Sequence, residues 1–342
     1  MARLTPGLKR IAGESAWVFA GQIVSALGTL AGFRIITEVV PPAVYGSVVL
    51  SIGLIALGQG LAVQPLMQAV LRHYPEYAKD GGVALLRRTA VNALRRPVLW
   101  LSGGLALVLA IWSGYTQQGF LLGPLCGLLF LVEVVRTVEV FFLSAEREQR
   151  TIAWFVAADA WSRPLFGFAA VSILGAHSAS VVGGYLAGSL LSLLGFYLLR
   201  RGGTTTVTQP PFVLEDAAAI RKRLWVYAMP LLLLPLIGWV SGQADRYIVG
   251  GFVGLQYAGL YAAIYGIASR PFLLVRDGVD LALRQVFYTQ FSEGNRAGQR
   301  RVFLLWLASV SGAALLGLLA IALLHRQIAG LLLAAEYRAY SS

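Results

Sequence analysis

The sequence predicts an all-α membrane protein built as a bundle of transmembrane helices, and three observations lead to this prediction. Of the 342 residues, 57% are hydrophobic and only 13% are charged, with a mean hydropathy of +0.70. Soluble domains carry about 45–50% apolar and about 25% charged residues, so a water-soluble core would not hide this much apolar surface. The apolar residues also form long runs, and Lys and Arg collect between alternate runs.

Nine apolar segments approach the length of about 20 residues that a helix needs to cross a bilayer. They span residues 17–40, 47–70, 97–113, 120–142, 152–174, 181–199, 224–248, 258–274 and 303–324. Turn signals such as Pro41-Pro42 separate them. The alternating segments of about 10 residues that build a transmembrane barrel do not occur. Cys126 is the only cysteine, which excludes a disulfide scaffold.

Basic residues predict the orientation of these segments. The amino-terminal tail and the connections 72–96, 147–150, 200–223 and 276–301 hold most of the 28 Lys and Arg residues, whereas 41–46, 114–119, 175–180 and 249–257 hold none. Because cytoplasmic loops collect Lys and Arg, we expect a cytoplasmic amino terminus. The net charge of +12 then reflects topology, and no nucleic-acid partner is expected.

An internal repeat predicts two lobes. Trp17-Val18-Phe19-Ala20 opens the first segment as Trp225-Val226-Tyr227-Ala228 opens the seventh, and Tyr45-Gly46 resembles Ala258-Gly259. The polar connections that follow share Gln, Glu, a basic residue and Gly at one spacing, 217 residues apart. The copies start on the same side, six segments apart, which defines a parallel repeat. The alternative is coincidence among apolar residues.

The repeat implies two parallel six-helix lobes, the second of them incomplete. Residues 1–200 are expected to form the amino-terminal lobe, 201–223 a basic cytoplasmic linker, and 224–342 the first three helices of the carboxy-terminal lobe. With nine spans, the carboxyl end of the sequence would lie outside.

Several motifs resemble a known family of transporters. The region from Asp245 to Leu255, followed by Ala258-Gly259-Leu260-Tyr261 and Tyr265-Gly266-Ile267-Ala268, resembles the signature region of bacterial polysaccharide (O-antigen) flippases. These belong to the multidrug/oligosaccharidyl-lipid/polysaccharide (MOP) exporter superfamily. Pro42-Ala43-Val44-Tyr45-Gly46 is similar to the short motif between their first two spans.

This resemblance implies a multi-pass protein of the bacterial inner membrane with twelve or more spans in two lobes. Such proteins move a polyprenyl-pyrophosphate-linked oligosaccharide to the outer leaflet by alternating access, coupled to an ion gradient. They serve O-antigen, capsule or exopolysaccharide biosynthesis, so other polysaccharide-assembly membrane proteins are expected partners. A chain with nine spans would be a carboxy-terminally truncated member.

Ionisable residues inside the apolar segments are the candidate site residues, because such groups are costly in a bilayer and usually face a cavity. They are Arg34 and Glu38, then Glu133, Arg136 and Glu139, then Asp159 and Arg163, and finally Asp245, Arg246 and Arg270. Residues three or four apart share a helix face, so many of these charges can neutralise one another within one helix. Arg270 has no such acid nearby in its own segment.

The functional hypothesis is a cationic cavity that binds an anionic substrate. Arginine holds phosphate oxygens through two hydrogen bonds and stays charged when desolvated. The expected substrate-binding residues are Arg34, Arg136, Arg163, Arg246 and Arg270. Arg34 and Arg246 fall at similar depths of the repeat and are expected to clamp a pyrophosphate. The ion-coupling candidates are Asp159, Asp245 and Glu133, because burial favours the protonated form of a carboxylate. A static salt bridge is the alternative for Asp159.

Three other functions remain open. An antiporter of cationic drugs from the same superfamily predicts an acidic cavity, whereas the deep residues of this chain lean towards Arg. A membrane glycosyltransferase or polymerase needs acidic or histidine chemistry in a large loop. A purely structural assembly subunit is the third. No catalytic motif occurs, and the three histidines are too scattered for a metal site, so no metal or cofactor is expected. Aromatic residues near segment ends, among them Tyr45, Trp100, Tyr115 and Tyr247, are interpreted as interfacial anchors.

Overall fold

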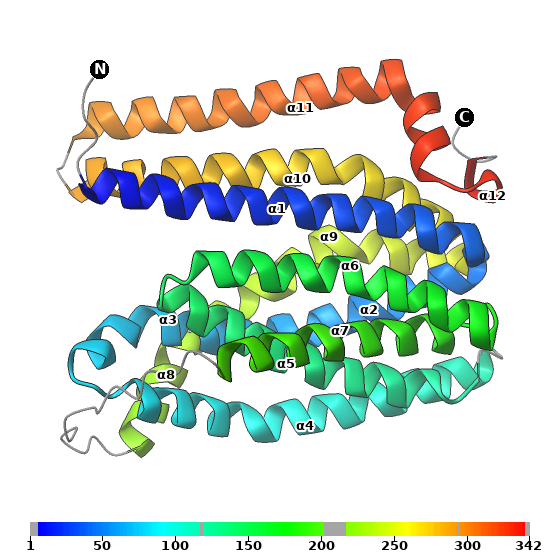
Figure 1. Ribbon diagram of the computed structural model, residues 1–342, viewed down its shortest axis with the longest axis horizontal. Coiled ribbons are helices and arrows are strands. Elements are labelled where there is room, and N and C mark those ends of the chain that lie inside the picture. Colours follow the sequence, from blue (N-terminus) through cyan, green and yellow to red (C-terminus); the bar gives the residue numbers. More distant parts are fainter. Residues whose placement is uncertain (1–5, 117–118, 202–216, 293–294, 339–342) are drawn as a thin grey trace.

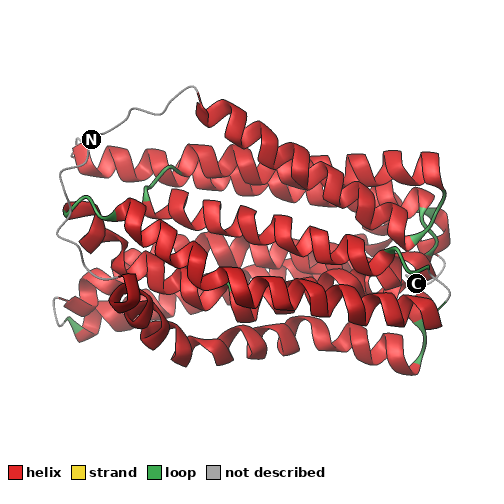
Figure 2. Ribbon diagram, turned by 90° about the horizontal axis from the view of Figure 1, so that it is seen from below, coloured by secondary structure: helices red, strands yellow, loops and turns green. Residues whose placement is uncertain are grey.

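A computed structural model describes residues 6–116, 119–201, 217–292 and 295–338. The described residues form helices and short connections with no strand, as Figure 2 shows. Most of the helices run along the long axis of the molecule, and their connections gather at its two ends (Figures 1 and 2). The prediction of an all-α bundle is therefore confirmed.

Short connections separate one helix from the next along most of the described chain. In chain order, the helices are α1 (Pro6–Val39), α2 (Pro42–Ala62), α3 (Gln64–Lys79), α4 (Val83–Tyr115), α5 (Leu122–Ala145), α6 (Gln149–Leu174), α7 (Ser178–Arg201), α8 (Ala217–Ala228), the 3₁₀ turn η1 (Met229–Leu232), α9 (Leu233–Phe252), α10 (Leu255–Ser292), α11 (Arg296–Leu332) and α12 (Ala335–Arg338). Each of the nine predicted segments falls on this helical framework.

Six helical runs among the described residues are long and apolar enough to cross a membrane, which indicates a multi-pass membrane protein. They are Phe19–Val39, Pro42–Ala62, Val83–Tyr115, Ser178–Arg200, Ala217–Phe252 and Arg296–His325. The other three predicted segments form α5, α6 and α10, which contain most of the deep charged residues. The count of nine spans therefore stays a prediction.

Two predicted connections are helical instead. Residues 72–79 lie in α3 and residues 83–96 in α4, while residues 276–292 lie in α10 and residues 296–301 in α11. Basic side chains in these stretches lie on helix extensions because Lys and Arg are good helix formers. Gly81, with φ 72°, supplies the turn before α4.

Proline divides two predicted segments. The segment 47–70 breaks at Val63 between α2 and α3, where Pro65 lies in the first turn of the new helix. In the segment 224–248, the α-helix changes to the 3₁₀ turn η1, which contains Pro230. Proline lacks the N–H that the previous helical turn would bind, so each break follows from local sequence.

The buried core lies mainly among α2, α3, α4 and α5, where Val48, Met67, Phe130 and Phe142 are almost wholly buried. α6 packs closely along both α1 and α7. α11 lies at the edge of the bundle and packs mainly on α10 (Figure 1), and its most apolar stretch has no buried residue.

A reciprocal glycine contact joins α2 to α10. A Cβ atom placed on Gly46 would lie 2.0 Å from the carbonyl oxygen of Leu255, and one placed on Gly259 would lie 2.0 Å from that of Pro42. Only glycine permits backbones to approach this closely. The pairs Gly46/Gly259 and Pro42/Leu255 are each separated by 213 residues, so the two halves of the contact mirror each other.

Candidate functional site: an arginine-lined central cavity

A cavity of about 980 Å³ lies inside the bundle. Its walls come from α1, α2, α5, α6 and α7 in the earlier part of the chain and from α9 and α10 in the later part. We call it the central cavity. Four of the five predicted arginines line it, namely Arg136, Arg163, Arg246 and Arg270, together with Asp159. Helices distant in sequence therefore bring most of the predicted cationic residues to one space.

Arg136 and Arg163 belong to a four-residue charge cluster with Glu133 and Asp159, which we call the tetrad. Within α5, Arg136 Nη2 lies 2.6 Å from Glu133 Oε2, and within α6, Arg163 Nε lies 3.0 Å from Asp159 Oδ2. Arg163 also pairs with Glu133 across the two helices, and Arg136 Nε lies 3.7 Å from Asp159. Two guanidinium groups thus face two carboxylates, which makes the tetrad electrically neutral.

Both carboxylates of the tetrad are buried. The Ser192 hydroxyl of α7 donates a hydrogen bond of 3.3 Å to Asp159 Oδ1. Arg163 Nε and Nη2 are close to carboxylate oxygens but make no hydrogen bond of good geometry with the described residues. Arg136, by contrast, donates from Nε and Nη2 to Glu133 Oε2 at 3.2 and 2.6 Å, so the tetrad combines hydrogen-bonded pairs with pairs held by charge attraction alone.

Arg246 of α9 behaves differently because no described carboxylate lies within ion-pair distance of its guanidinium group. Its Nη1 donates a hydrogen bond of 2.5 Å to Gln243 Oε1, and the group lies 5.3 Å from the centre of the Tyr265 ring. Its buried Nε has no hydrogen-bond partner among the described residues. A positive charge with an unused donor therefore faces the central cavity.

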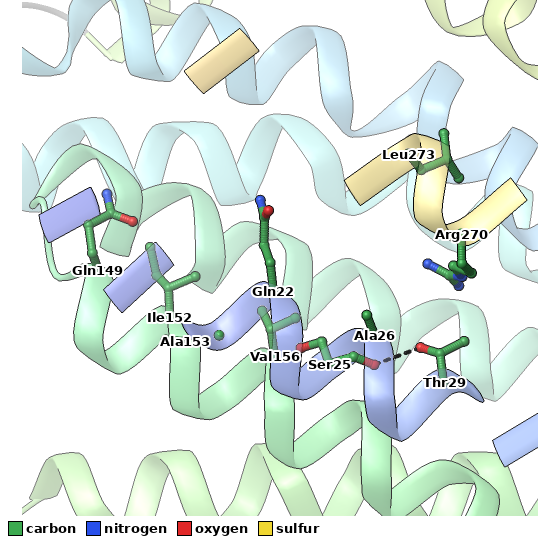
Figure 3. Close-up of a pocket in the computed structure, with 11 residues that line it drawn as sticks. Gln22, Ser25, Ala26, Thr29, Gln149, Ile152, Ala153, Val156, Arg270 and Leu273 are labelled. Atoms are coloured by element: carbon green, nitrogen blue, oxygen red, sulfur yellow. Dashed lines mark hydrogen bonds between the residues drawn. The ribbon is translucent and has the colours of Figure 1, made fainter. Parts of the chain in front are cut away.

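Arg270 of α10 is the second cavity arginine without a described carboxylate partner. It lies where the central cavity meets a smaller pocket of about 300 Å³ between α1, α6 and α10. Figure 3 shows the Arg270 side chain near the turn of α1 in which Thr29 Oγ1 donates to the Ser25 carbonyl oxygen at 2.9 Å. Since the tetrad is neutral, Arg246 and Arg270 leave the described cavity wall with two excess positive charges.

The structure does not bring Arg34 to this site. Arg34 Nη1 donates to the carbonyl oxygen of Leu333 at 2.8 Å, and Nη2 lies 2.9 Å from Glu38 Oε2. Nearby, the Tyr337 hydroxyl donates to the Val40 carbonyl oxygen at 2.8 Å. Burial raises the pKa of Tyr337, so this donor stays protonated. The predicted Arg34–Arg246 clamp is therefore not formed, because Arg34 instead fastens the segment after α11 to α1.

Asp245 also lies outside the cavity lining. Its Oδ1 accepts a hydrogen bond of 2.8 Å from the backbone N–H of Arg246, and its Oδ2 accepts one of 2.5 Å from the Tyr261 hydroxyl. Adjacent helical residues point about 100° apart, which keeps the two charged side chains from pairing. Of the three ion-coupling candidates, only Asp159 reaches the cavity, while Glu133 supports it from within the tetrad.

Two aromatic residues lie elsewhere than the sequence predicts. Their positions near segment ends predict that Tyr45 and Tyr247 anchor the protein at the membrane surface. Tyr45 is instead buried and lines the central cavity, and the Tyr247 hydroxyl donates to the Leu50 carbonyl oxygen at 2.6 Å inside the α2–α9 contact. Trp100 and Tyr115 do remain 82% and 86% exposed.

A sequence signal for part of this cavity does exist. On α10 the lining residues recur every three or four positions, as expected for one face of a helix. They are Ala262, Tyr265, Gly266, Ser269, Arg270 and Leu273. Small and polar residues along that stripe distinguish it from a face that packs only against lipid.

The fold and the cavity together define a class, that of all-helical, multi-pass membrane proteins with an arginine-lined cavity inside the bundle. Comparison with known proteins does not narrow this class: no family model matches the chain, and neither a curated protein nor a solved structure matches it.

Proposed function

We propose that the protein is a flippase that moves a polyprenyl-pyrophosphate-linked oligosaccharide across a bacterial inner membrane by alternating access. In this proposal the amino terminus is cytoplasmic and nine helices span the bilayer, six in one lobe and three in a second. The anionic headgroup would enter the central cavity, and the polyprenyl tail would stay in lipid.

The observation that carries the proposal is the charge of the central cavity. Glu133 and Asp159 neutralise Arg136 and Arg163, whereas Arg246 and Arg270 have no described carboxylate partner. A cavity with excess positive charge attracts an anion and repels a cationic drug. Arginine also offers the paired donors that pyrophosphate oxygens accept. An anionic cargo is therefore favoured over the cationic cargo of a multidrug antiporter.

The reciprocal contact of Gly46 and Gly259 supports the two-lobe arrangement. Two copies of a unit related by a twofold axis make isologous contacts, in which residue i of one copy meets residue j of the other and j meets i. Here Gly46 meets Leu255, and Gly259 meets Pro42. Gly46 and Gly259 are counterparts in the predicted repeat, and the surrounding Pro42 and Leu255 obey the same offset of 213. Helices α2 and α10 would then cross near the axis between the lobes.

The tetrad supplies a candidate for ion coupling. Asp159 is buried, reaches the cavity, and is balanced by charges on α5 and α6. If opening of the cavity moves α5 relative to α6 within the amino-terminal lobe, Asp159 loses part of this neutralisation and takes up a proton more readily. Proton binding at Asp159 would then be linked to the direction in which the cavity opens.

A reconstitution experiment tests the proposal. Proteoliposomes would contain a fluorescent polyprenyl-pyrophosphate-linked oligosaccharide, and a membrane-impermeant quencher would report its movement between leaflets. We expect translocation by the wild type and a loss of at least about tenfold in the double variant Arg246→Gln, Arg270→Gln, because charge-assisted contacts to phosphate are lost.

Arg221→Gln is the matched control, since Arg221 lies exposed on α8 away from the cavity. The proposal fails if the wild type moves no pyrophosphate-linked lipid, or if the double variant moves it as fast as the control. Uptake of a cationic dye in place of the lipid would identify the antiporter instead.

A further inference from the structure

A second, separate groove lies between α4 and α5, with Tyr197 of α7 at one end. It has a volume of about 400 Å³, and we call it the α4/α5 groove. Its walls are apolar and include Val91, Leu94, Val98 and Leu99 of α4 with Val135 and Val138 of α5. Arg87, Arg95 and Glu139 provide the charged groups along it.

The exposed face of α4 shows where this groove meets the membrane surface. Arg88, Arg95 and Arg96 are exposed on the first half of the helix, whereas the exposed residues from Leu99 and Trp100 onwards are largely apolar. The apolar stretch 97–115 is about 28 Å long at 1.5 Å per residue. That matches the bilayer hydrocarbon thickness of about 30 Å, so Arg95 and Arg96 fall at headgroup depth.

The charge of the groove is positive at that depth. Glu139 is buried and pairs with Arg87, and it accepts a hydrogen bond of 2.7 Å from the Tyr197 hydroxyl. This acid is therefore already neutralised. Arg95, on the groove, and its exposed neighbour Arg96 make no ion pair with any residue that the structure describes. An anionic ligand complements this rim.

A neighbouring groove between α6 and α7 offers a contrast within the same protein. It is larger, about 880 Å³, and its charged residues are Arg150 and Arg200 with Glu146 and Glu148. Arg200 Nη2 lies 2.8 Å from Glu146 Oε2. Two acids balance two bases, so this groove is neutral and has no comparable preference for an anion.

We propose that the α4/α5 groove binds an anionic phospholipid. The headgroup phosphate would accept hydrogen bonds from Arg95 and Arg96, with Arg88 adding long-range attraction, and one acyl chain would lie along Val98, Leu99 and Val135. Arginines at headgroup depth attract anionic lipid, and the apolar parts of their side chains pack against the chains. The site is distinct from the central cavity and does not depend on the transport function.

Native mass spectrometry of the delipidated protein tests this site. The protein is titrated with dioleoyl phosphatidylglycerol or with dioleoyl phosphatidylcholine, which differ in headgroup charge but not in their chains. We expect the wild type to retain the anionic lipid preferentially. Arg95→Gln, Arg96→Gln should lower its affinity about fivefold for each arginine removed. Added salt should weaken binding to the wild type more than to this double variant.

Two further variants separate a specific groove from general attraction. Arg150→Gln, at the neutral α6/α7 groove, removes one charge elsewhere and should leave phosphatidylglycerol binding unchanged. Leu99→Trp, at an exposed position of the α4/α5 groove, fills its apolar part without changing charge and should reduce binding. Equal retention of the two lipids by the wild type, or wild-type affinity in either the double variant or Leu99→Trp, would overturn the proposal. Circular dichroism and elution volume confirm that each variant folds. If the double variant does not fold, Arg88→Gln, at an exposed position of the same helix, takes its place.

Discussion

Gly46 of α2 and Gly259 of α10 meet at a helix crossing in which each would place a Cβ atom 2.0 Å from a backbone oxygen of the other helix. The crossing joins segments more than two hundred residues apart. It also lies beside the central cavity, since Tyr45 and Ala262 near the two glycines both line that space. The spacing of α2 and α10 therefore influences the width of the cavity.

Gly259→Ala is expected to destabilise the protein by about 1–3 kcal/mol, because the new methyl group would force the two backbones apart. Thermal unfolding in detergent measures the effect. Gly103→Ala is the control, since nothing lies within 4 Å of a Cβ atom at that position of α4. Equal melting temperatures of the two variants would contradict the close contact.

Arg246→Gln is expected to weaken binding of a polyprenyl-pyrophosphate lipid by about tenfold to a hundredfold, the range for a lost charge-assisted hydrogen bond. Arg246→Lys should fall between wild type and Gln, because lysine keeps the charge but lacks the planar fork. Quenching of intrinsic fluorescence on titration would report the affinity. If Arg246→Lys binds the lipid no better than Arg246→Gln, the loss of affinity comes from the geometry of the guanidinium group and not from its charge.

Asp159→Asn is expected to cost about 3 kcal/mol of unfolding free energy, because it leaves a buried cluster with one carboxylate for two guanidinium groups. Combining it with Arg136→Gln restores neutrality, and Arg163 still faces Glu133. The double variant should be more stable than the sum of the single effects predicts. Strict additivity in a double-mutant cycle would show that the tetrad does not act as a unit.

Arg34→Gln tests the corrected role of that residue. Loss of its hydrogen bond to the Leu333 carbonyl oxygen should loosen the segment 333–337, whereas affinity for a ligand of the central cavity should not change. Hydrogen–deuterium exchange there should quicken about tenfold, as expected when a hydrogen bond to a charged group is removed. A fall in ligand affinity with unaltered hydrogen–deuterium exchange of the segment 333–337 would show that Arg34 belongs to the binding site.

Local rules fixed much of what the sequence could predict. Long apolar runs require helices, since a bilayer leaves backbone groups no other partner. The spacing of Arg34 and Glu38, of Glu133 and Arg136, and of Asp159 and Arg163 predicted pairing within single helices, and the structure shows all three pairs. Proline likewise marked the break at Val63 between α2 and α3.

These local rules do not predict how helices that are distant in sequence pack against one another. Arg34 and Arg246 occupy matching places in the predicted repeat, yet one binds the segment after α11 and the other faces the cavity. The contact of Arg163 with Glu133 merges two local pairs into the tetrad, and no spacing along one helix predicts it. By itself the sequence determined a helical membrane protein with buried charges and the pairs each helix can make. Tertiary packing alone decided which charges share the cavity and which stay unneutralised, because that depends on the rotation and closeness of helices far apart in the chain.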